Sequence, residues 1–72
     1  MPFVHIQLVK GLLKDDVAAK KAAISRSVVD AIAEQSGLAK DQVWVVIQEV
    51  PNTEWFVGEK RVEQIWAERD AG

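Results

Sequence analysis

The sequence contains no cysteine, which excludes disulfide bonds and metal sites built from thiolates. It contains one histidine, His5, and a single imidazole cannot form a zinc site alone. The 72 residues suffice for one domain, residues 1–72, whose core rarely contributes more than about 3–5 kcal/mol of stability. With neither disulfides nor a metal, so small a chain needs another source of stability. We therefore predict a homo-oligomer.

Basic runs and long apolar runs are also missing. Nine lysine and arginine residues face eleven acidic ones, which gives a formal net charge of −2. Nucleic-acid-binding proteins usually carry a basic patch, so we expect no nucleic-acid partner. No apolar run approaches the roughly 18 residues of a membrane-spanning helix. Lys10 and Gly11 interrupt the first apolar stretch, so we predict no signal peptide, no membrane partner and a cytoplasmic location.

Two segments have the patterns of β-strands. Val4, Ile6 and Leu8 alternate with polar residues, which predicts a half-buried strand over residues 2–9. Residues 43–50 are rich in β-branched side chains and almost continuously apolar at first. Such a composition is typical of a strand that is covered on both faces. The first strand also carries His5, which we expect to be partly buried with a backbone hydrogen-bond partner.

Between the two strands lies a segment with helical spacing and many alanines. We predict a helix that ends near Ser36, with Asp15 or Asp16 as the N-terminal cap and Gly37 just past its end. A strand, a crossover helix and a second strand indicate a right-handed β-α-β unit with parallel strands. Its sheet would keep uncovered edges and an uncovered face, which another subunit could cover.

The C-terminal part is less regular. Pro51-Asn52 indicates a turn, and residues 55–58 fit a short edge strand or one arm of a hairpin. Residues 59–70 leave two interpretations open. The spacing of Val62, Ile65 and Trp66 fits a short helix, and a second hairpin arm is the alternative.

The features that carry a family resemblance are Met1-Pro2, the first strand ending in Lys10-Gly11, the helix, residues 43–50 and Trp55-Phe56-Val57-Gly58. Through these features the sequence resembles the 4-oxalocrotonate tautomerase family over residues 2–58. The resemblance implies an α/β fold: a β-α-β subunit with a short C-terminal hairpin or helix. It also implies a hexamer built as a trimer of dimers. The implied activity is a cofactor-independent isomerisation of small 2-oxo or enol carboxylates, without a metal.

The resemblance implies that Pro2 is the catalytic base. Methionine before proline is normally removed, which would leave Pro2 with a free secondary amine. An ordinary α-amino group has a pKa of roughly 7.7–8.0, and an apolar pocket, here built from Phe3, Trp55 and Phe56, would lower the pKa by disfavouring the ammonium form. The free base could then remove a proton next to a carbonyl and return it elsewhere, which is keto–enol tautomerisation.

The sequence departs from the family at the positions of its two carboxylate-binding arginines, which are Leu12 and Trp44 here. Neither side chain can pair with a carboxylate in the bidentate manner of arginine. Trp55 matches the aromatic residue of the family's pocket wall. The candidate substrate-binding residues are therefore Leu12, Trp44, Trp55 and Phe56, with Lys14, Arg61 or Lys10 as substitute cations.

Two other functions stay open. Loss of both arginines also fits a non-catalytic partner subunit of a hetero-oligomer. A promiscuous amine-catalysed hydratase or aldol-type activity of Pro2 is the other alternative. The dehalogenase branch of the family uses a carboxylate after the aromatic residue, and Val57 at that position cannot activate water.

Overall fold

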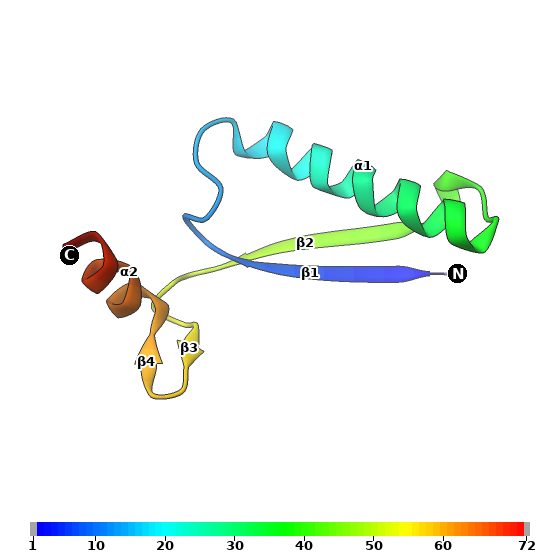
Figure 1. The fold of residues 1–72 in the computed structure, drawn as a ribbon. Helices are drawn as coiled ribbons and strands as arrows, with labels where there is room; N and C mark the ends of the chain where they lie inside the picture. The colour runs from blue at the N-terminus through cyan, green and yellow to red at the C-terminus, as the bar shows by residue number, and fades with distance from the viewer. Residues whose placement is uncertain (1, 72) are drawn as a thin grey trace.

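The computed structural model describes residues 2–71, so the predicted removal of Met1 concerns a residue outside the described range. It confirms an α/β subunit built on a β-α-β unit with parallel strands (Figure 1). The C-terminal part, for which a hairpin and a helix were both open, contains both. In chain order the elements are β1 (Phe3–Val9), α1 (Val17–Ser36), the 3-10 helix η1 (Lys40–Gln42), β2 (Trp44–Val50), β3 (Phe56–Val57), β4 (Lys60–Arg61) and α2 (Val62–Ala71).

The central sheet consists of β1 and β2, which pair in parallel from Phe3↔Trp44 to Val9↔Val50. Helix α1 runs along one face of this sheet (Figure 1). The even-numbered residues of β1 and the odd-numbered residues of β2 share the face under the helix and are half-buried. An ion pair of 3.0 Å between Lys21 Nζ and Glu49 Oε2 joins α1 to β2.

Helix α1 ends as the sequence predicts, but it begins differently. Gly37 follows it with a φ of 77° and donates its N–H to the Ala33 carbonyl oxygen at 2.9 Å. Asp16 occupies the N-cap position, yet its carboxylate forms no capping hydrogen bond, so that part of the prediction was wrong. Asp15 and Asp16 are both left-handed, with φ of 55° and 49°. A capping side chain usually projects from an extended backbone instead. Within the described residues, no helix is both long and apolar enough to cross a membrane.

The other face of the sheet carries large apolar side chains in contact with solvent. Phe3 is 60% exposed, Trp44 55% and Val46 43%. The prediction that β2 is covered on both faces is therefore not met within one chain, because only α1 covers it. We call the surface formed by Phe3, Trp44 and Val46 the open face.

The chain is too extended to bury more than a small core. Among the described residues, Val43 and Val62 form the buried apolar core. The radius of gyration is 15.5 Å, whereas a compact domain of this length has about 11 Å. The accessible surface is 5355 Å², compared with roughly 4,500 Å² for a folded monomer of this mass. The β3–β4 hairpin and α2 lie beyond the end of the main sheet (Figure 1), which explains the excess surface.

Candidate active site

Pro2 lies at the start of β1 and is held there by the sheet. The Trp44 N–H donates to the Pro2 carbonyl oxygen at 3.1 Å. Phe3, which follows Pro2, is the register partner of Trp44. Pro2 is half-buried. Chain termini are usually mobile unless an element ties them down, and here the first hydrogen bond of the parallel pair does so.

The open face near Pro2 combines aromatic and polar side chains. Phe3 and Trp44 lie opposite each other on it. Two residues further along, His5 Nε2 lies 3.0 Å from Gln48 Oε1, and Gln7 Nε2 donates to the same oxygen at 3.5 Å. Because a carbonyl oxygen only accepts, His5 donates through Nε2. His5 is exposed and has a side-chain partner, so the expectation of a partly buried histidine with a backbone partner was wrong.

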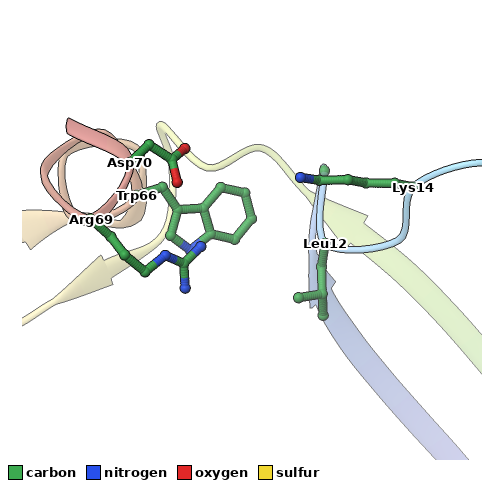
Figure 2. A pocket seen from close by; sticks show the side chains of 6 residues that line it. Leu12, Lys14, Trp66, Arg69 and Asp70 are labelled. Carbon is green, nitrogen blue, oxygen red and sulfur yellow. The ribbon is translucent and has the colours of Figure 1, made fainter. Parts of the chain in front are cut away.

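At the opposite end of β1 lies a cavity of about 190 Å³ (Figure 2). Leu12 and Lys14, both predicted as site residues, contribute to its wall from the loop after β1. Helix α2 contributes three residues that were not predicted as site residues. The lining residues are Gly11, Leu12, Lys14, Trp66, Arg69 and Asp70. Arg69 follows Trp66 by three positions, so helical spacing places both on the same face of α2. That spacing was the available signal for finding Arg69.

Close packing between the loop and Trp66 shapes this cavity. Gly11 has a φ of +97°, and a Cβ at this position would lie 3.3 Å from Cζ3 of Trp66. The Arg69 guanidinium carbon lies 6.0 Å from the centroid of the Trp66 ring, within the range of a cation–π contact. Figure 2 shows the Lys14 side chain extending toward the space beside Trp66.

The remaining predicted residues lie in the C-terminal hairpin. Phe56 and Arg61 are register partners in β3 and β4, and both are exposed. The Trp55 carbonyl oxygen accepts the Val62 N–H at 2.8 Å, which anchors the hairpin to the start of α2. Arg61 donates its backbone N–H to Gln64 Oε1 at 3.0 Å.

The candidate residues thus form separate groups within one chain. Pro2 lies beside Trp44, and Leu12 and Lys14 meet α2 at the far end of β1. The seven residues of β1, at about 3.3 Å per residue, separate the two groups by roughly 20 Å. The hairpin with Trp55, Phe56 and Arg61 lies beyond the same far end (Figure 1). A single subunit therefore does not bring these side chains to its own Pro2. Among residues 2–71, no three histidine or acidic side chains are grouped to hold a metal ion.

Known proteins resemble this chain in sequence and fold. A family model described as tautomerase enzyme matches residues 2–65. Three solved structures illustrate the likeness. A 4-oxalocrotonate tautomerase isozyme from Methylibium petroleiphilum is 30% identical, covers 89% of this chain and 97% of its own, and has a TM-score of 0.76. TomN, a 4-oxalocrotonate tautomerase homologue of the tomaymycin biosynthetic pathway, is 31% identical over 99% of this chain and 97% of its own, with a TM-score of 0.71.

The third structure is a heterohexamer 4-oxalocrotonate tautomerase from Chloroflexus aurantiacus J-10-fl. It is 28% identical over 90% of this chain and 98% of its own, with a TM-score of 0.77. No curated protein gives a significant match. Because the family model spans nearly the whole chain and the solved relatives share its fold, the chain belongs to the 4-oxalocrotonate tautomerase family of the tautomerase superfamily.

Proposed function

We propose that the chain, once Met1 is removed, is a cofactor-independent tautomerase that uses the secondary amine of Pro2 as its base. The substrate class is a small enolisable 2-oxo carboxylate. The observation that carries this proposal is the hydrogen bond from the Trp44 N–H to the Pro2 carbonyl oxygen, at 3.1 Å. It fixes Pro2 in the sheet, so that an amine at this position would have a defined orientation toward a substrate.

The proposed reaction needs only proton transfer. The free amine would take a proton from the carbon next to the carbonyl, which leaves an enolate, and would return it at another position of the same molecule. Phe3 and Trp44 present apolar surface at this end of β1, and burial of that surface by another subunit would disfavour the charged ammonium form. Because Trp44 cannot hold a second carboxylate, we propose that monoacids with an aromatic or apolar body are preferred to diacids.

We further propose that the working form is a homo-oligomer, with a hexamer as the expected assembly and the cytoplasm as the expected location. The extended shape, the excess surface and the open face all leave apolar area for other subunits to cover. The solved relative from Chloroflexus aurantiacus is itself a heterohexamer. Substrate-binding roles for Trp55, Phe56 and Arg61 belong to this proposal as well, since only another copy could bring them to Pro2.

A second candidate function is that of a non-catalytic partner subunit in a hetero-oligomer. Two observations favour it. Leu12 and Trp44 occupy the positions where the family resemblance implies arginines, and a solved relative is described as a heterohexamer. Such a chain would keep the fold and the interfaces but would need a second gene product for activity.

The deciding experiment joins intact mass, oligomeric state and rate. After mass spectrometry confirms that Met1 is gone, wild type and Pro2→Ala are assayed with phenylenolpyruvate and 2-hydroxymuconate. We expect activity on the monoacid and a fall in kcat/KM of up to about 100-fold in Pro2→Ala, because the variant replaces a secondary amine fixed in a ring by a freely rotating primary amine. Absence of activity on both substrates, with the oligomer intact and Met1 removed, would reject the tautomerase and favour the partner subunit.

A further inference from the structure

The cavity between the loop after β1 and helix α2 has no role in the function proposed so far. Three of its six lining residues, Trp66, Arg69 and Asp70, lie beyond residue 65, where the match to the family model ends. Half of the cavity lining therefore lies outside the matched family segment. Figure 2 shows a cation from the loop and a cation from the helix on either side of the same space.

The cavity combines charge with a flat apolar surface. Lys14 and Arg69 supply two positive charges and Asp70 one carboxylate, which leaves one net positive charge. Among residues 2–71 the ion pairs use other cations, namely Lys21, Lys40 and Lys60. Arg69 contacts the face of Trp66 instead, at 6.0 Å from the ring centroid. A single net positive charge matches a monoanion, and the indole with its guanidinium matches a planar body.

The size of the cavity limits what it can hold. Its volume is about 190 Å³, below the roughly 300–1,000 Å³ of pockets for drug-sized ligands. We propose that this cavity binds a small planar monocarboxylic acid, with Lys14 and Arg69 on the carboxylate and Trp66 against the planar body. The same cavity is lined by Leu12, where the family resemblance implies a carboxylate-binding arginine. Arg69 would thus take over a role that Leu12 cannot perform.

A substrate bound in the cavity can reach Pro2 only if the cavity and Pro2 belong to different copies of the chain. This step rests on the proposed function. Within one chain, β1 separates the two by roughly 20 Å, much more than a small acid can span. The sheet has only two strands, so β1 and β2 are both edges. Antiparallel pairing of an edge across a twofold axis places the end of one strand beside the start of its copy. The cavity of one subunit would then adjoin the Pro2 of another.

Binding is tested in a protein whose proposed catalytic proline is replaced. Pro2→Ala is titrated with cinnamate by calorimetry, and the indole N–H of Trp66 is followed by NMR. Cinnamamide, which has the same planar body without the charge, is the control ligand. We expect saturable binding of cinnamate, a shift of the Trp66 signal and at least tenfold weaker binding of cinnamamide.

Matched variants in the same Pro2→Ala background identify the cations. Arg69→Gln removes the charge but keeps a polar side chain and a good helix former, and we expect it to weaken cinnamate binding about tenfold. Arg26→Gln removes an exposed arginine of α1 far from the cavity lining and should change nothing. Asp70→Asn should tighten binding several-fold, because it removes the opposing charge. Equal affinity in Arg69→Gln and its parent, or no saturable binding at all, would overturn the site.

Subunit mixing tests the link to Pro2. Pro2→Ala and Arg69→Glu are each assayed alone, then mixed, unfolded and refolded together. If the two groups come from different copies, about one quarter of the sites in a random assembly regain both intact groups, so the mixture exceeds both parents. A mixture no more active than the mean of its parents rejects the shared site. If wild type itself turns over no substrate, the proposed function fails, and the cinnamate titration still decides the cavity.

Discussion

At the scale of single residues, Gly11 connects strand β1 to the cavity beside α2. It closes β1, turns the chain with a φ of +97° and lets the loop approach Trp66. Any other residue here would adopt a left-handed backbone at a cost of roughly 1–2 kcal/mol, and its Cβ would crowd the indole. The cavity that we propose as an acid site therefore depends on the absence of a side chain at this position.

We predict that Gly11→Ala lowers the free energy of unfolding by about 2 kcal/mol, measured by urea denaturation. Gly58→Ala is the comparison, because Gly58 has a φ of +64° and its Cβ would meet no atom within 4 Å. The contact with Trp66 is isolated by a double-mutant cycle with Trp66→Phe. Strictly additive effects in that cycle would show that Trp66 and the residue at position 11 do not interact.

At the scale of elements, the attachment of α1 to the sheet combines half-buried apolar residues with one ion pair. Lys21 Nζ lies 3.0 Å from Glu49 Oε2, and the two side chains are 31% and 23% exposed. The pair of Lys40 and Asp30 has the same distance but is 71% and 48% exposed. Screening by solvent makes exposed pairs weak, with typical contributions of about 0–1 kcal/mol. The two ion pairs have the same N–O distance and differ in solvent exposure, so comparing them tests the effect of burial on the strength of the pair.

We predict a coupling energy of about 1 kcal/mol between Lys21 and Glu49, and less than about 0.5 kcal/mol between Lys40 and Asp30. Double-mutant cycles with Lys→Met and acid-to-amide substitutions measure both. Raising the salt concentration should reduce the smaller coupling proportionally more, because exposed charges are screened more strongly. Equal coupling energies for the two pairs would mean that the partial burial of Lys21 and Glu49 does not strengthen their ion pair.

The elements themselves were largely predictable, and the candidate site was not. Alternation gave β1, helical spacing gave α1, and Gly37 marked its end, because each of these signals is local. The capping role of Asp16 failed because its left-handed backbone was not readable from the sequence. The cavity brings residues after β1 against α2 from the far end of the chain. Periodicity predicts which residues share a helix face, but it does not say what that face contacts.

At the scale of the whole molecule, the chain has the shape of one part of an assembly. Its extents of 46 × 27 × 17 Å describe an elongated plate, and large apolar side chains remain exposed on the open face. The sequence predicted self-association from chain length and the absence of disulfides. It placed Pro2 and Leu12 at opposite ends of one strand, but it did not predict the cavity that forms between the loop after that strand and α2. In a site assembled from two copies, Pro2 of one copy would lie beside the cavity of the other.

The final prediction tests self-association through the open face. Val46 is 43% exposed near the middle of β2, so Val46→Glu should place a charge in any interface that covers this face. We expect loss of the oligomer and a lower, concentration-independent melting temperature, because burying an unpaired carboxylate costs several kcal/mol. Ala31→Glu adds the same charge to an exposed position of α1 and should leave the oligomer intact. Sedimentation velocity measures both variants beside wild type. An unchanged oligomer in Val46→Glu would show that the open face stays in solvent, and the proposed assembly would then have to use the strand edges alone.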